Sequence, residues 1–360
     1  MSIENSLIKF KQLLTVYYLM NNTLSLSKKV AKLKKDTSGF TANPTLDAFN
    51  EDYCSILDEI AKKDCFVGDR IKRSIKELNL AGGVSYNDHY RTAYDYYNEA
   101  VCYYELQRKG YMVNNIPEEK KATPDFKVVL SSLNEKLKKV YIEVKSLSFV
   151  GGNNRFNEIQ KDALNNYISI EQQRRNGKQV CIAEQVISPL GTNSIIGEIE
   201  ELNKKINNNI KREQYEYDNR DDTILLVDLS QYIFPLKKED CLPIYPDISH
   251  KCCITGRLWM LVFGKEGERV YRLLDFEGDK CIEDKGLGLS GILECPEHDY
   301  IRGIIFTSGT TPKDKIFYGL YREKEQNRDV VDFICEVCDF TNDNQNTNGF
   351  KLYEELTRPM

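Results

Sequence analysis

The sequence predicts an α/β protein, with a central mixed sheet flanked by helices, a helical N-terminal region and a β-rich C-terminal extension. Three observations lead to this prediction. Apolar residues recur at helical spacing in residues 1–85, and helical and strand-like segments alternate in residues 86–230. From residue 231 onward, short β-like runs are separated by Gly, Pro and Asp turns.

In the N-terminal region, two helices are predicted. Residues 3–20 place Ile, Leu, Phe and Tyr side chains roughly on one stripe, and residues 46–63 repeat that pattern. Gly82 and Gly83 then indicate a linker to the central region.

The central region is expected to begin with a helix over residues 93–109, which ends at the C-cap Gly110. The elements expected after it are a strand at 111–113, hairpin strands at 126–130 and 140–147, a helix carrying Gln160, a polar helix at 194–217 and a strand at 223–227. In the C-terminal extension, strands are expected at 258–263, 270–274, 301–306 and 315–321, before a loosely ordered tail.

Composition narrows the class of protein. The chain has 360 residues, 29% of them charged and 41% hydrophobic, and its net charge of −5 argues against a protein that coats nucleic acid indiscriminately. Local basic clusters still occur at residues 28–35, 70–76, 136–139 and 174–175. No apolar run approaches the roughly 20 residues of a membrane span, and the N-terminus lacks a signal pattern. We therefore expect a cytoplasmic protein without membrane contact, whose eleven cysteines are reduced thiols.

Three residues near the middle of the chain carry the strongest chemical signal. Asp125 follows Pro124, and Glu143 and Lys145 lie two positions apart in a predicted strand. Strand alternation puts Glu143 and Lys145 on one face, so that a carboxylate and an ammonium project side by side. Carboxylates are ligands that hard divalent cations prefer, and such cations support phosphodiester hydrolysis.

The spacing of these residues sharpens the signal. Asp125 and Glu143 are separated by 17 residues, enough for a strand, a polar turn and a returning strand. This hairpin is expected to bring Glu143 close to Asp125. A third carboxylate, Glu99, lies on the preceding helix, and we favour it over Glu105 because its neighbours are apolar or aromatic.

In order and context these residues resemble the PD-(D/E)XK nuclease superfamily, which has the restriction-endonuclease-like fold. The resemblance covers about residues 90–185 and extends to the strand expected near 223–230. Pro124-Asp125 looks like the PD element, Glu143-Val144-Lys145 looks like the ExK element, and Glu99 matches the acidic residue on the preceding helix. Gln160 is similar in placement to a glutamine that some branches add.

The resemblance implies an Mg²⁺- or Mn²⁺-dependent nuclease, an endonuclease rather than an exonuclease, that acts on DNA or else on RNA. Asp125 and Glu143 would hold the metal, Glu99 would be an additional ligand, and Lys145 would lie near the attacking water. It also implies a role in restriction, repair, mobile-element processing or anti-phage defence, as a homodimer or with a partner protein.

Other readings of the same residues remain open. Glu143 and Lys145 would also suit a salt bridge on a solvated sheet face, and Asp125 would suit the start of a turn. Gln160 would equally suit a polar surface. At the level of function, the alternative is a catalytically inactive nucleic-acid-binding or protein-interaction module on the same fold.

Overall fold

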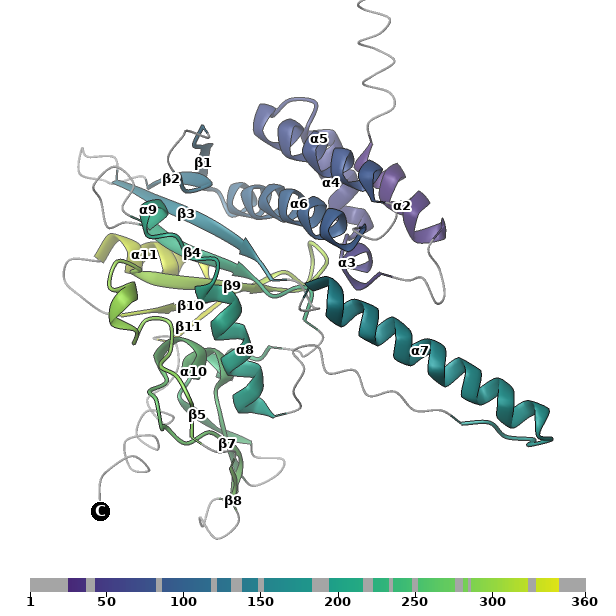
Figure 1. Ribbon diagram of the computed structural model, residues 1–360. Coiled ribbons are helices and arrows are strands. Elements are labelled where there is room, and N and C mark those ends of the chain that lie inside the picture. Colours follow the sequence, from purple (N-terminus) through teal and green to yellow (C-terminus); the bar gives the residue numbers. More distant parts are fainter. Residues whose placement is uncertain are drawn as a thin grey trace, which may run out of the picture. The chain divides into compact units, whose positions relative to one another are not determined.

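In a computed structural model (Figure 1), the chain divides into two compact units, Met1–Val101 and Cys102–Met360. The structure describes residues 25–36, 43–81, 86–117, 122–130, 138–147, 152–182, 194–215, 223–232, 236–247, 252–275, 281–283, 286–322 and 328–342. The helix predicted over residues 3–20, the Gly82-Gly83 linker and the tail after residue 342 lie outside these ranges.

Helices make up the described part of the N-terminal unit. They are α2 (Leu26–Asp36), α3 (Pro44–Asp47), α4 (Glu51–Ile60), α5 (Cys65–Leu80) and the first part of α6 (Tyr86–Arg108). Side-chain caps begin two of them. The Asn50 side chain accepts a hydrogen bond from the Tyr53 amide, and the Asp64 carboxylate accepts from the Phe66 and Val67 amides. These findings confirm the helical character predicted for this region.

The second unit is built on a mixed seven-stranded sheet in the order β1-β2-β3-β4-β9-β10-β11. Its strands are β1 (Met112–Asn115), β2 (Phe126–Leu130), β3 (Lys138–Ser146), β4 (Thr223–Asp228), β9 (Gly303–Ser308), β10 (Ile316–Tyr321) and β11 (Phe340–Thr341). Strands β1, β2 and β3 are antiparallel neighbours, whereas β3, β4 and β9 run parallel. The mixed sheet and the hairpin that the sequence predicted are therefore present.

The sheet extends beyond the predicted central region. Strands β9, β10 and β11 continue it from β4, so residues 303–341 complete the same sheet instead of standing apart after residue 231. The inserted part is a smaller antiparallel sheet, β5 (Ile244–Asp247), β6 (Cys252–Thr255), β7 (Tyr271–Asp275) and β8 (Cys281–Glu283). Because strand pairing between distant segments leaves no local pattern, the sequence did not reveal this continuity.

Helices pack on both faces of the large sheet. On one face, α8 (Ile195–Asn207) and α10 (Arg257–Phe263) share an apolar core with β4, β9 and β10. On the other, α11 (Arg328–Val337) lies so close that a Cβ at Gly319 would be 2.3 Å from the Ile334 side chain. Glycine at position 319 is thus required by the approach of the helix. A further helix, α7 (Gly152–Arg175), follows the hairpin and carries Gln160.

Three predicted elements were wrong in detail. The helix predicted over 46–63 is divided into α3 and α4, with Asn50 as the N-cap of α4. The apolar run 258–263, predicted as a strand, is the helix α10, because a short apolar run does not distinguish strand from helix. Its first amide, that of Arg257, donates to the distant Asp240 carboxylate, a partner that only the fold supplies. The helix predicted over 194–217 is divided into α8 and α9 (Arg212–Tyr215), with Asn208 as the C-cap of α8.

A buried ion pair joins the ends of three strands. The Lys315 ammonium, at the start of β10, donates to the fully buried Asp228 carboxylate of β4 at 2.8 Å. Hydroxyls of Ser230 and Thr307 donate to the same carboxylate oxygen at 2.6 and 2.9 Å. Burial alone would raise the pKa of Asp228, but the Lys315 ammonium and these hydrogen bonds outweigh it and lower the pKa.

Among the described residues, no helix is long and apolar enough to cross a membrane.

Candidate active site

The hairpin of β2 and β3 brings Asp125 to Glu143, as predicted. The Asp125 amide donates to the Ile142 carbonyl at 3.0 Å, and the Asp125 carboxylate accepts a hydrogen bond from the Val144 amide at 2.8 Å. The Asp125 backbone is therefore held at the residue before Glu143, and its side chain at the residue after it.

Glu143 lies in the third strand of the sheet, paired on one side to β2 and on the other to Leu225 of β4. Only 2% of it is exposed. Burial, and then the neighbouring Asp125 carboxylate, raise the pKa of Glu143 to about 8, against the opposing effect of Lys145. A raised pKa of this kind is expected where a second carboxylate lies close to a buried one.

Lys145 contacts Glu143 directly. Its ammonium donates to the Glu143 Oε1 atom, and 18% of its side chain is exposed. The strand alternation predicted from the sequence therefore places the ammonium and the carboxylate on one face. The pair is largely buried, not solvated, which sets it apart from a surface salt bridge.

Two further residues of this site were missed by the sequence analysis. Gln214 of α9 donates its amide to Glu143 Oε1 at 2.6 Å and to the Thr123 carbonyl at 3.4 Å. Tyr215, fully buried, packs its ring 5.4 Å from Tyr300. Burial first, and then the Glu143 carboxylate, raise the pKa of Tyr215 well above its ordinary value, so it is a neutral phenol. The run of asparagines at the end of α8 was a sequence signal for this, because asparagine disfavours helix and so indicates that α8 ends before the residues of α9.

Three polar atoms at this site are buried and have no hydrogen-bond partner among the described residues. They are Glu143 Oε2, Gln214 Oε1 and the Tyr215 hydroxyl oxygen. Lys145 and Gln214 both donate to Glu143 Oε1, which leaves the second carboxylate oxygen without a donor. Burying such an atom without a partner costs about 1–3 kcal/mol. Oxygen atoms in this state are suitable ligands for a hard divalent cation, which prefers oxygen donors.

Glu99 is described in the N-terminal unit, where its carboxylate is 2.5 Å from Arg70 Nε. Its assignment as a metal ligand stays a prediction. Among the described residues, no group of three His, Cys, Asp or Glu side chains is arranged to hold a metal ion. Gln160 lies in α7, but its side chain is not among those described.

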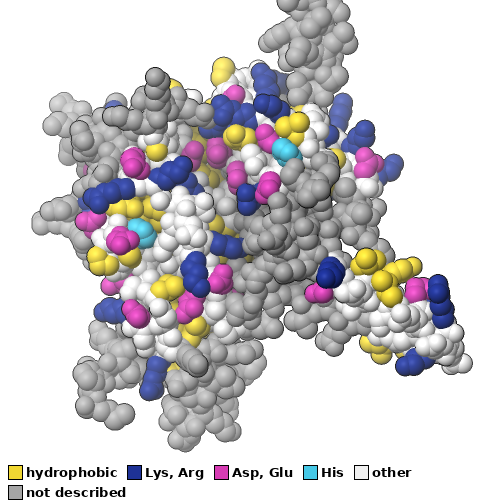
Figure 2. All heavy atoms as spheres, in the orientation of Figure 1, with side chains coloured by type: hydrophobic (Ala, Val, Ile, Leu, Met, Phe, Trp, Pro, Cys, Tyr) yellow, Lys and Arg dark blue, Asp and Glu magenta, His cyan; other side chains and the backbone are white. Residues whose placement is uncertain are grey.

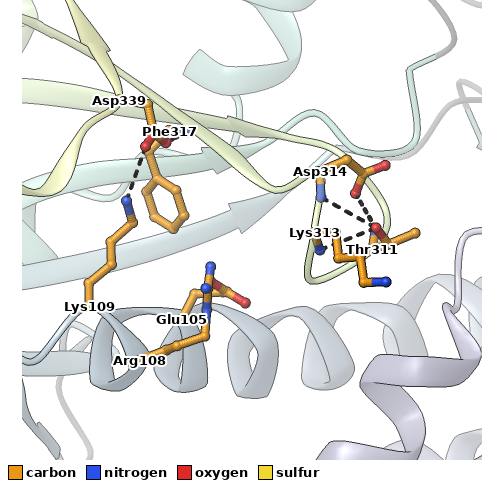
Figure 3. Close-up of polar contacts among 8 residues, drawn as sticks. All are labelled: Glu105, Arg108, Lys109, Thr311, Lys313, Asp314, Phe317 and Asp339. Carbon is orange, nitrogen blue, oxygen red and sulfur yellow. Dashed lines mark hydrogen bonds and ion pairs between the residues drawn. The ribbon is translucent and has the colours of Figure 1, made fainter.

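Glu105 is not the surface charge that the sequence allowed. It is fully buried, and its Oε2 atom accepts two hydrogen bonds from Arg108 at 2.9 and 2.7 Å. Figure 3 shows both residues on α6, beside Lys109, which forms an ion pair with Asp339 at 3.4 Å. Glu105 therefore has a structural partner within the second unit.

These assignments give opposite expectations for the two glutamates. Glu99→Gln is expected to lower cleavage at least about tenfold, roughly 1.4 kcal/mol in the activation barrier. Glu105→Gln is expected to leave cleavage nearly unchanged and to lower the free energy of unfolding by about 1–2 kcal/mol, because it weakens a buried hydrogen bond. Cleavage rates and urea denaturation of both variants test this, and the reverse pattern would move the third carboxylate to Glu105.

The role of Gln214 can be tested in the same way. Gln214→Ala is expected to lower both Mn²⁺ affinity and cleavage about 10- to 100-fold, as expected when a residue that orients a metal ligand is lost. Gln172→Ala, at an exposed position of α7, is the matched control and should change neither. Wild-type affinity in the Gln214 variant would show that the amide does not position Glu143.

Comparisons with protein-family models, curated proteins and solved structures found no match for this chain.

Proposed function

We propose that the protein is a metal-dependent nuclease that hydrolyses phosphodiester bonds, most readily those of DNA, with a restriction-endonuclease-like core. The observation that carries the proposal is the buried, unpartnered Glu143 Oε2 atom, on a side chain that lies near both Asp125 and Lys145. The order of the elements also supports it, because α6, the β1-β2-β3 antiparallel strands and the parallel strand β4 follow the pattern implied by the resemblance.

The residues present fit a hard divalent cation. Asp125 and Glu143 would hold Mg²⁺ or Mn²⁺, with the unpartnered Gln214 oxygen as a further donor. When bound, such a cation supplies charge stabilisation at the phosphate and lowers the pKa of a water ligand.

The protein's own side chains would orient the metal ligand and stabilise negative charge on the phosphate. The Gln214 amide fixes Glu143 through its Oε1 atom, so that the Oε2 atom keeps one orientation. The Lys145 ammonium lies beside that carboxylate and is partly exposed, so it can stabilise negative charge that develops on the phosphate oxygens. It can also orient the attacking water by donating a hydrogen bond.

The experiment that tests the proposal is a cleavage assay on purified full-length protein. Supercoiled plasmid, linear duplex, single-stranded DNA and RNA are each incubated with Mg²⁺, with Mn²⁺ and with a chelator. We expect metal-dependent conversion of plasmid to nicked and linear forms, and none with the chelator. Binding without cleavage under all conditions would instead support the inactive nucleic-acid-binding module.

A further inference from the structure

Helix α2 of the N-terminal unit carries an unusual concentration of positive charge. Five of its eleven residues are lysines and one is an aspartate. Leu26 and Val30 are fully buried, whereas Lys28, Lys32 and Lys35 are exposed. Positions four and three apart lie on one helix face, so these three lysines form a basic stripe about 10 Å long. Figure 2 shows Lys and Arg side chains gathered over the helices of this unit.

The basic stripe is not neutralised within the described residues. Three other surface cations of the same unit have carboxylate partners: Lys62 is 2.6 Å from Glu59, Arg73 is 2.9 Å from Asp69, and Arg91 is 3.4 Å from Asp88. No described carboxylate forms an ion pair with Lys28, Lys32 or Lys35. Like charges at this spacing repel one another, so the stripe weakens α2 unless an anion is bound.

Contacts outside the stripe hold α2 in place. The Asp58 carboxylate accepts hydrogen bonds from the Leu26 amide at 2.8 Å and from the side chains of Ser25 and Ser27 at 2.8 and 2.7 Å. At the other end, the Lys34 ammonium donates to the Phe49 carbonyl at 2.7 Å. The lysines of the stripe are therefore presented on a fixed helix, which lowers the entropy cost of binding an anion.

The chemistry of a matching partner follows from these features. A row of evenly spaced ammonium groups fits a ligand with evenly spaced negative charges, such as the phosphate backbone of a nucleic acid. A lipid surface fits less well, because the apolar face of α2 is buried inside the unit and cannot enter a bilayer.

We infer that the basic stripe binds the phosphate backbone of the nucleic-acid substrate, without sequence preference. The inference rests on the proposed function and assigns to the N-terminal unit a part in holding the substrate. It also accounts for substrate binding by a protein of negative net charge, because the positive charge is localised.

The test is a binding titration of full-length protein with labelled duplex and single-stranded DNA, with Ca²⁺ in place of Mg²⁺. The stripe variant is Lys28→Glu, Lys32→Glu, Lys35→Glu. The control is Lys62→Glu, Lys204→Glu, Lys238→Glu, which makes the same charge change at lysines paired to carboxylates. The stripe variant should bind at least about tenfold more weakly. The slope of its log affinity against log salt concentration should be shallower by the equivalent of about two to three phosphate contacts. The control should stay within about threefold of wild type.

Circular dichroism shows whether both variants are folded. If the Glu stripe variant is not folded, the milder Lys→Gln variant at the same three positions replaces it and should lose part of the DNA affinity. Equal binding by the stripe and control variants would overturn the inference while leaving the cleavage function intact. The inference would also be overturned if the stripe variant bound anionic vesicles more weakly than wild type but bound DNA equally well. Wild-type protein that neither binds nor cleaves nucleic acid would overturn the proposed function as well.

Discussion

Lys145→Ala is expected to lower the cleavage rate at least about 100-fold, roughly 2.7 kcal/mol in the activation barrier, while Mn²⁺ binding is retained. The reason is that the ammonium acts on charge in the transition state and is not a metal ligand. Removing it also frees Glu143 Oε1 from one of its two donors, so metal affinity should not fall. Single-turnover cleavage and Mn²⁺ titration of the same preparation measure the two effects separately.

Lys139→Ala is the matched control for this prediction. Lys139 lies on the same strand and, by alternation, on the same face as Lys145, but pairs with Val129 at the far end of the hairpin. Its variant should cleave at close to the wild-type rate. Equal effects of the two substitutions, or near-normal turnover in Lys145→Ala, would restrict Lys145 to a structural role.

Lys315→Met is expected to destabilise the protein by about 3–5 kcal/mol, because it leaves the Asp228 charge buried without its cation. Asp228 is fully buried, and only 2% of the Lys315 side chain is exposed, so solvent cannot compensate. Adding Asp228→Asn to the same variant should recover part of the loss, since it removes the unpaired charge. Equilibrium denaturation in urea measures all three proteins.

The same pair predicts a pH dependence of stability. The pKa of Asp228 is lower in the folded state than in the unfolded state. Its contribution to the free energy of unfolding is therefore fully present above the unfolded-state pKa of about 4, and is lost as the pH falls through the folded-state pKa. Asp228→Asn should remove this dependence. Lys204→Met, which breaks the exposed pair with Glu201, should change stability by less than about 0.5 kcal/mol at any pH. An Asp228→Asn variant with the wild-type acid profile would contradict the assignment.

Local patterns predicted much of the fold. The alternation in residues 140–147 and the apolar run at 223–227 identified β3 and β4, and Gly110, with φ of +93°, ends α6 as expected. Contacts between distant segments were not predictable. The helix α10 depends on a hydrogen bond to Asp240, and the extension of the sheet to β11 depends on pairing that no local pattern records.

In the candidate site, too, the residues close in sequence could be predicted and the distant ones could not. Asp125, Glu143 and Lys145 could be predicted because they lie on a single hairpin, whose spacing fixes their relation. Gln214 reaches Glu143 across 71 positions of sequence, so its role emerges only from the fold. The buried ion pair of Asp228 and Lys315, 87 positions apart, is of the same kind.

Titration calorimetry with Mn²⁺ tests the central claim most directly. Wild-type protein should bind the ion, and Asp125→Asn and Glu143→Gln should each weaken binding at least about tenfold, because each removes a charged oxygen ligand. Both variants should remain folded by circular dichroism. Equal Mn²⁺ binding by wild type and both folded variants, or no binding by any of them, would contradict a metal site at Asp125 and Glu143.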